Sequence, residues 1–95
     1  MQDTTITPVE EIEESTEKIR VLLVDDHHVV RQGLVMFLGL DPELQVVGEA
    51  ADGAQAVQLA DQVRPNVILM DLLMPVMDGL TAIHKIKQAH PEIEI

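Results

Sequence analysis

The sequence predicts an α/β protein built on a parallel, doubly wound sheet. Short apolar runs alternate along the chain with amphipathic stretches of about eleven residues, which is the pattern of repeated strand–helix–strand units. Right-handed crossovers place the connecting helices of such units against the faces of one sheet. The runs that we interpret as strands cover residues 19–24, 44–50 and 67–70, and residues 93–95 resemble the start of a fourth strand.

The predicted strands differ in how deeply they should be buried. Residues 67–70 are entirely apolar, as in a strand of a parallel sheet that is covered on both faces. Residues 19–24 are nearly as apolar. Residues 44–50 include Gln45 and Glu49, which is typical of an edge strand.

The first predicted helix covers residues 28–38. Its apolar stripe at helical spacing consists of Val30, Leu34, Phe37 and Leu38. Gly33 lies inside this helix, where glycine costs about 1 kcal/mol relative to alanine. We therefore expect the helix to approach the sheet closely at this glycine.

Two further helices follow turn signals and end before prolines. The second begins at Asp52-Gly53 and stops before Pro65, with an apolar face formed by Ala56, Val57, Ala60 and Val63. The third follows Asp78-Gly79 and ends at Pro91. Its inward residues are predicted to be Leu80, Ile83 and Ile86.

The composition excludes several classes of protein. The 95 residues allow one small domain at most, and the absence of cysteine excludes disulfides and thiolate metal sites. A formal charge of −11 and a single aromatic residue, Phe37, argue against direct nucleic-acid binding by this segment. No apolar run reaches the ~20 residues of a membrane span and no signal peptide opens the chain. We therefore expect a cytoplasmic protein that does not bind membranes.

The first eighteen residues differ from the rest in charge. Residues 1–18 hold six acidic side chains against one lysine, a formal charge of −5, and few apolar residues. Such a stretch buries too little apolar surface to fold alone. We predict a disordered acidic leader over residues 1–18 and a folded domain over residues 19–95.

Carboxylates follow two of the predicted strands, at the point where each strand ends. Asp25 and Asp26 come directly after residues 19–24, and Asp71 comes directly after residues 67–70. Ligands of open α/β sheets bind at the carboxyl ends of the strands, where these side chains would meet. Three unpaired carboxylates repel each other, and Mg²⁺, which prefers hard oxygen ligands, would remove that repulsion. An aspartate that merely ends a strand is the simpler interpretation of each position alone.

His27 and His28 follow the acidic pair and allow two interpretations. As structural residues they begin the first helix at the rim of the site. As ligands beside Asp25 and Asp26 they would bind a transition metal, because Asp26-His27-His28 after an apolar strand resembles the signature of manganese-dependent phosphoesterases. That family needs an upstream strand with an Asp-rich metal motif, and only the acidic leader precedes residue 19.

Taken together, the motifs resemble the receiver domain of bacterial two-component response regulators. The resemblance covers residues 19–95 and rests on Val24-Asp25-Asp26-His27, Gly48-Glu49-Ala50, Asp52-Gly53 and the stretch from Asp71 through Pro75 to Asp78-Gly79. Residues 24–34 are similar to the LuxR-type subfamily, in which a helix-turn-helix DNA-binding domain follows the receiver. The resemblance implies a flavodoxin-like fold with strand order 2-1-3-4-5 when complete.

The resemblance also implies roles for single residues and a set of partners. Asp71 matches the phosphoacceptor, which takes a phosphoryl group from a sensor histidine kinase. Asp26 matches the direct Mg²⁺ ligand, Asp25 the carboxylate that helps through water, and Leu73 the residue whose backbone carbonyl binds the metal. The chain would then be a switch rather than an enzyme, acting on transcription through a DNA-binding domain elsewhere in the parent protein. Homodimer formation stays open.

The sequence departs from the family in length. Receivers of this family continue beyond the position of Ile95 with the rest of the fourth strand and a fifth, which end in a Ser/Thr and a Lys. We therefore expect a partial receiver, incomplete at its C-terminus, in which Leu34, Phe37 and Leu38 partly meet water. A module that docks without being phosphorylated is the alternative function.

Overall fold

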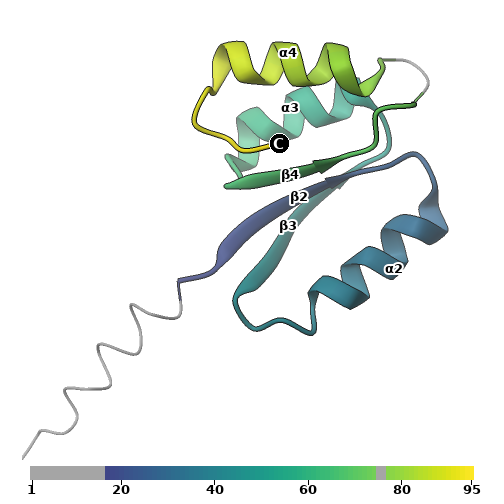
Figure 1. The fold of residues 1–95 in the computed structure, drawn as a ribbon, viewed down its shortest axis with the longest axis vertical. Helices are drawn as coiled ribbons and strands as arrows, with labels where there is room; N and C mark the ends of the chain where they lie inside the picture. The colour runs from purple at the N-terminus through teal and green to yellow at the C-terminus, as the bar shows by residue number, and fades with distance from the viewer. Residues whose placement is uncertain (1–16, 75–76) are drawn as a thin grey trace, which may run out of the picture.

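The computed structural model describes residues 17–74 and 77–95, which form an α/β fold (Figure 1). The elements in chain order are β2 (Ile19–Val24), α2 (His28–Leu38), β3 (Leu44–Ala50), α3 (Gly53–Val63), β4 (Val67–Met70) and α4 (Gly79–Ala89). Every predicted strand and helix up to residue 89 is therefore confirmed. The predicted acidic leader lies outside the described residues, apart from Glu17 and Lys18, and so does Pro75 of the predicted turn.

The sheet is parallel, and its strands lie in the order β3-β2-β4. This is the first part of the expected order 2-1-3-4-5, with the polar strand β3 at the edge. The β2–β4 register runs from Val21↔Val67 to Val24↔Met70, so both strands end at the same level. Beyond β4, residues 93–95 contribute one parallel bridge, Val67↔Glu94, in place of a longer strand.

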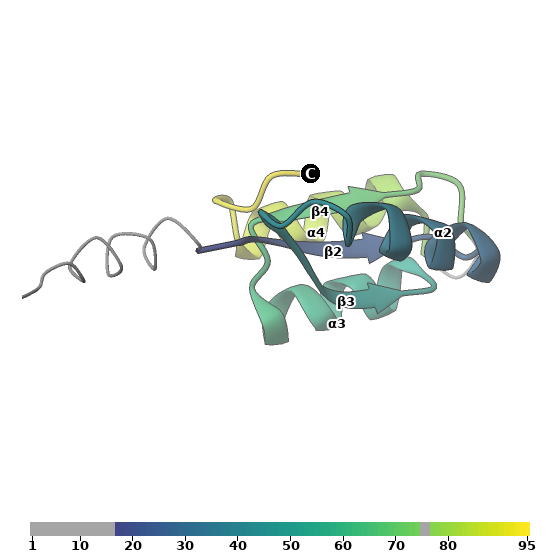
Figure 2. The same ribbon diagram turned by 90° about the horizontal axis from the view of Figure 1, so that it is seen from below.

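Helices cover both faces of this sheet, which confirms the doubly wound arrangement. Helix α2 lies on one face, and α3 and α4 lie together on the other (Figures 1 and 2). The core forms between the sheet and the α3–α4 layer, and its buried residues include Leu22, Val24, Ala56, Ala60, Ile68, Ile86 and Ile93. The small residues Ala56 and Ala60 let α3 lie close to the sheet.

Two of the helices begin with an aspartate cap. The side chain of Asp52 accepts a hydrogen bond from the Gln55 N–H at 2.8 Å, and Asp78 accepts one from the Thr81 N–H at 2.8 Å. Each cap satisfies one of the amide donors that a helix leaves unpaired in its first turn. These caps fix where α3 and α4 start, beside the carboxyl ends of the strands.

Helix α2 packs less tightly than its apolar stripe suggests. None of its residues is buried; Leu34 and Leu38 are half-buried, and the Phe37 side chain is 69% exposed. The expected close approach at Gly33 is wrong, since a Cβ added there would meet no atom within 4 Å. The expected exposure of part of this stripe agrees with the structure.

Two expectations about single apolar residues are also wrong. Leu80 is 67% exposed, because the inward positions of α4 are taken by Gly79, Ala82 and Ile86. Leu69 is 41% exposed, so β4 is not covered on both faces. Leu69 lines the same cavity as Leu34 of α2, on the face of the sheet that this one helix covers only in part.

Candidate metal centre

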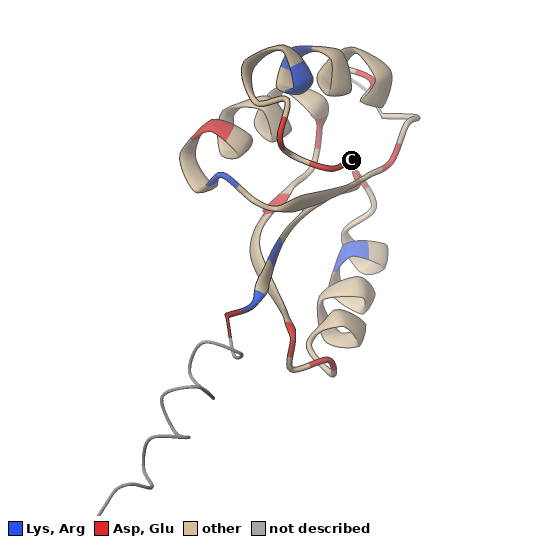
Figure 3. Ribbon diagram, turned by 60° about the vertical axis from the view of Figure 1, so that its left-hand side comes forward, with Lys and Arg blue, Asp and Glu red and all other residues tan. Residues whose placement is uncertain are grey.

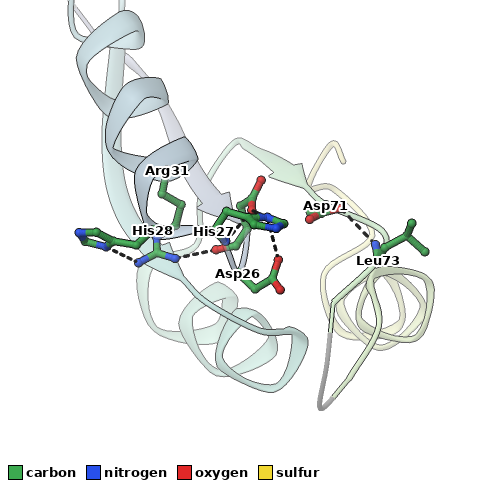
Figure 4. Close-up of polar contacts among 7 residues, drawn as sticks. Asp26, His27, His28, Arg31, Asp71 and Leu73 are labelled. Carbon is green, nitrogen blue, oxygen red and sulfur yellow. Dashed lines mark hydrogen bonds and ion pairs between the residues drawn. The ribbon is translucent and has the colours of Figure 1, made fainter.

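Three carboxylates and one imidazole gather where β2 and β4 end. The Asp71 N–H donates to the Val24 carbonyl at 2.9 Å, and the Asp25 N–H donates to the Ala50 carbonyl at 3.1 Å. These bonds continue the sheet by one residue and bring the two strand ends side by side. One ligand atom from each of Asp25, Asp26, His27 and Asp71 lies within 4.8 Å of the others (Figure 4). We call these four residues the acidic cluster.

His27 is held in the cluster by Asp25. The His27 backbone N–H lies 2.8 Å from Asp25 Oδ1, and its ring Nδ1 lies 2.9 Å from the same oxygen. The ring Nδ1 also lies 3.2 Å from Asp26 Oδ1. The hydrogen bond to Asp25, followed by the negative charges of Asp26 and Asp25, raises the pKa of His27. His27 immediately precedes α2, so it is the N-cap residue of this helix as well as a member of the cluster.

Asp26 presents an oxygen that accepts no hydrogen bond within the part of the chain that the structure describes. Its Oδ1 is buried and accepts no hydrogen bond from the described residues, although His27 Nδ1 lies 3.2 Å away. The two observations are compatible, because Nδ1 lies closer to Asp25 Oδ1, at 2.9 Å. A buried carboxylate oxygen without a donor costs free energy, and a divalent cation with oxygen ligands would compensate it. The donor set therefore fits Mg²⁺.

The backbone after β4 holds Asp71 in place. The Leu73 N–H donates to Asp71 Oδ1 at 3.1 Å (Figure 4). The Gly79 N–H donates to the Leu72 carbonyl at 3.0 Å. A Cβ at Gly79 would lie 2.5 Å from the Asp71 carbonyl oxygen and 2.6 Å from Leu72 Cα. Only glycine lets α4 begin this close to the strand end. The metal role of the Leu73 carbonyl remains a prediction.

Two carboxylates of the cluster, those of Asp25 and Asp71, border an open cavity of about 370 Å³. Its lining consists of Val24, Asp25, Leu34, Leu69, Met70 and Asp71. Asp25 and Asp71 supply its polar wall, and aliphatic side chains from β2, β4 and α2 supply the remainder. A small anion could therefore reach Asp71 from solvent.

His28 lies outside the acidic cluster. Its Nδ1 is 3.4 Å from Arg31 Nη2, on the side of α2 that turns away from Asp71 (Figure 4). Among the residues that the structure describes, the cluster takes in only Asp26 and His27 from the Asp26-His27-His28 signature. The two histidines therefore occupy different environments.

Arg31 contacts the cluster, and the sequence reasoning did not single it out. Its Nη1 donates to the Asp25 carbonyl at 2.6 Å, and its Nε donates to Glu49 Oε1 at 3.2 Å. The signal in the sequence was weak: one arginine in the second turn of a predicted helix, where most arginines extend into solvent.

The six basic residues of the chain are dispersed. They lie near the start of β2, on α2, after α3 and on α4 (Figure 3), and they are Lys18, Arg20, Arg31, Arg64, Lys85 and Lys87. A nucleic-acid interface needs such residues gathered on one surface. Within residues 17–74 and 77–95, no helix is long and apolar enough to cross a membrane.

Comparison with known proteins identifies the family. Residues 21–95 match the model of the response regulator receiver domain. The chain is 54% identical over 68 residues to the transcriptional regulatory protein LiaR of Bacillus subtilis, which covers 72% of this chain and 32% of LiaR. The chain spans about a third of the length of the first curated relatives it matches.

Solved structures agree with this assignment and with the flavodoxin-like fold. The response regulator domain of Thermotoga maritima CheB superposes with a TM-score of 0.77 at 40% identity, covering 79% of this chain and 56% of that one. A LuxR-family two-component response regulator from an Aurantimonas species superposes with a TM-score of 0.77 at 35% identity, covering 81% and 55%. The chain belongs to the family of response regulator receiver domains, and its relatives include the LuxR type.

Proposed function

We propose that this receiver accepts a phosphoryl group on Asp71, with Mg²⁺ held by Asp25, Asp26, Asp71 and the backbone carbonyl of Leu73. The observation that supports this most directly is the acidic cluster itself, in which Asp26 lies close to two other carboxylates and its buried Oδ1 accepts no hydrogen bond from the described residues. The cluster lies at the carboxyl ends of parallel strands, where ligands of open α/β sheets bind.

The chemistry assigned to Asp71 is a phosphoryl transfer. A carboxylate oxygen of Asp71 attacks phosphorus, the bond from phosphorus to a phosphohistidine nitrogen breaks, and that nitrogen keeps the electron pair. The Leu73 N–H donates to Asp71 Oδ1, which orients the carboxylate. Bound Mg²⁺ would supply neutralisation of the charge on the phosphoryl oxygens. The product is an acyl phosphate on the protein, so Asp71 acts as a stoichiometric acceptor and not as a turnover catalyst.

The donor that fits this chemistry is a sensor histidine kinase. The name of the relative LiaR, a transcriptional regulatory protein, suggests that the parent protein controls transcription. In this proposal a separate DNA-binding domain contacts DNA, because the dispersed basic residues of this chain do not form an interface for it. The protein would act in the cytoplasm, and homodimer formation stays open.

One observation favours a second function. The acidic cluster includes His27, so a transition metal could bind there as in a phosphoesterase. The position of His28 next to Arg31 argues against the complete Asp26-His27-His28 set. A docking module that is never phosphorylated is the third candidate, and it would use the same fold without Asp71 chemistry.

Phosphorylation with a small acyl-phosphate donor separates these functions. The chain is incubated with acetyl phosphate and Mg²⁺, and mass spectrometry follows the addition of one phosphoryl group. We expect the wild type to be labelled and Asp71→Asn to remain unlabelled. Asp78→Asn is the control and should be labelled normally, because Asp78 lies outside the acidic cluster and asparagine can still cap α4. Labelling of Asp71→Asn would contradict the assignment of Asp71 as the phosphoacceptor. Hydrolysis of a phosphate ester in the presence of Mn²⁺ would favour the phosphoesterase function.

A further inference from the structure

We infer that Arg31 is a positioning residue for the metal site: its guanidinium fixes the Asp25–Asp26 peptide against the end of β3. The inference rests on the proposed metal site, because it assigns Arg31 a role toward the ligands of that site. Arg31 touches no reacting atom itself and acts only through the backbone that carries Asp26.

The guanidinium joins three elements. Its Nη1 lies 2.6 Å from the Asp25 carbonyl in the β2–α2 loop, and its Nη2 lies 3.4 Å from His28 Nδ1 on α2 (Figure 4). Its Nε lies 3.2 Å from Glu49 Oε1 on β3. The Arg31 side chain is only 13% exposed. A planar group with donors in fixed directions can serve several acceptors at once, which an ammonium on a flexible stem cannot do equally well.

These contacts attach both ends of Asp25 to the end of β3. The Asp25 N–H donates directly to the carbonyl of Ala50, the last residue of β3. The Asp25 carbonyl is connected through Arg31 to the side chain of Glu49, the residue before Ala50. Asp25 is therefore held through both its N–H and its carbonyl, and the peptide that joins it to Asp26 is held through that carbonyl.

Asp26 is the residue that needs this support. Its buried Oδ1 accepts no hydrogen bond from the described residues, and the His27 Nδ1 that lies 3.2 Å away is closer to Asp25. The position of this oxygen therefore depends mainly on the backbone from which Asp26 projects. Residues around a metal site that orient its ligands typically change metal affinity by about 10–100-fold when they are removed.

The ion pair with Glu49 explains why an arginine is tolerated at a largely covered position. A guanidinium removed from water is costly unless it is paired and hydrogen-bonded. Glu49 supplies the negative charge, and the Asp25 carbonyl supplies a second acceptor. Glu49 thus has a role beyond that of a polar residue on an edge strand.

Metal affinity tests the inference in the full 95-residue chain. Mg²⁺ affinity is measured by competition: electron paramagnetic resonance detects the Mn²⁺ that Mg²⁺ displaces. The proteins compared are wild type, Arg31→Met, Arg31→Lys and Arg20→Met. We expect Arg31→Met to weaken Mg²⁺ binding by about tenfold and Arg31→Lys to restore part of the affinity. Arg20→Met is the matched control, because Arg20 binds the Arg64 carbonyl at the other end of β2. The Mg²⁺ affinity of Arg20→Met should equal that of the wild type.

A metal-free measurement accompanies this experiment. Hydrogen exchange is followed at the amides of Asp25, His27 and Ile68 in wild type and Arg31→Met. We expect faster exchange at Asp25 and His27, and unchanged exchange at Ile68, which donates to Glu94 near the start of β4. Faster exchange at all three amides would mean that Arg31 stabilises the whole fold, which would overturn the inference.

The two measurements separate failure of the inference from failure of the proposed function. An Arg31→Met chain that binds Mg²⁺ within about twofold of wild type would overturn the inference while leaving the metal site intact, since orienting residues have larger effects. A wild-type chain that binds no Mg²⁺ would overturn the proposed metal site. In that case hydrogen exchange alone decides whether Arg31 holds the Asp25–Asp26 peptide.

Discussion

The backbone N–H and the ring Nδ1 of His27 both lie within 2.9 Å of one atom, Oδ1 of Asp25. This oxygen is therefore occupied within the protein. The buried Oδ1 of Asp26, by contrast, accepts no hydrogen bond from the described residues. The two neighbouring aspartates thus differ in what they can offer to a cation, and we expect Asp26 rather than Asp25 to bind it directly.

The first prediction concerns metal affinity at this pair. Asp26→Ala removes the unsatisfied oxygen, so we expect Mg²⁺ binding to weaken by more than about tenfold, at least as much as on removal of an orienting residue. His27→Ala removes an imidazole whose raised pKa favours a positive charge beside the site. The His27→Ala substitution should therefore leave Mg²⁺ affinity unchanged or increase it. Isothermal titration calorimetry measures both.

The second prediction concerns metal selectivity. Oxygen ligands favour Mg²⁺ and Mn²⁺, whereas imidazole ligands favour Zn²⁺ and other transition metals. We expect the wild-type chain to prefer Mg²⁺ or Mn²⁺ over Zn²⁺, and His27→Ala and His28→Ala to lose no Mn²⁺ affinity. If either histidine variant lost as much Mn²⁺ affinity as Asp26→Ala does, this result would support the phosphoesterase function instead.

The third prediction compares two glycines. Gly79→Ala places a Cβ 2.5 Å from the Asp71 carbonyl oxygen, where only backbone could move away, so we expect a loss of stability of roughly 1–3 kcal/mol. Gly33→Ala meets no atom within 4 Å in an exposed helix and should gain about 0.5–1 kcal/mol. Urea denaturation followed by circular dichroism gives both values, and equal effects at the two positions would contradict the close approach at Gly79.

The fourth prediction concerns pH. The hydrogen bond from the Thr81 backbone lowers the pKa of Asp78 below its usual 3.8. The carboxylate therefore stabilises the fold above the unfolded pKa, and this contribution is lost as pH falls through the lower, folded pKa. We expect the thermal midpoint of wild type to fall relative to that of Asp78→Asn on acidification from pH 6 into this range. Asparagine also caps helices but does not titrate there. Parallel midpoints of the two proteins would contradict the role of Asp78.

The fifth prediction concerns self-association through the C-terminal end of α2. Met36, Phe37 and Leu40 are largely exposed there, next to an open cavity of about 360 Å³ bordered by Leu44. Apolar patches of this kind promote association. We expect the chain to elute earlier from size-exclusion columns as its concentration rises, and Phe37→Gln to reduce this shift. Val29→Gln, which changes an exposed residue at the other end of α2, is the control and should retain it.

The sequence alone determined the elements and the place where the carboxylates meet. Apolar runs and capping residues act locally, so the strand bounds and the starts of α3 and α4 at Asp52 and Asp78 could be predicted from neighbours along the chain. Parallel strands that end together bring the residues after them to one edge. For this reason the strand pattern alone predicts that Asp25 and Asp71 meet.

Only the tertiary structure decided how the side chains around that edge are used. Arg31 reaches Glu49, eighteen residues away, only through the packing of α2 beside β3, and β2 and β3 pair with a register shift between Val21 and Leu22 that no local pattern records. Gly79 rather than Leu80 faces inward because the backbone of Asp71 and Leu72 fills the space beside α4. Local propensity sets where an element begins, but the distances between elements depend on how whole surfaces pack. The contacts that orient the acidic cluster are of this second kind.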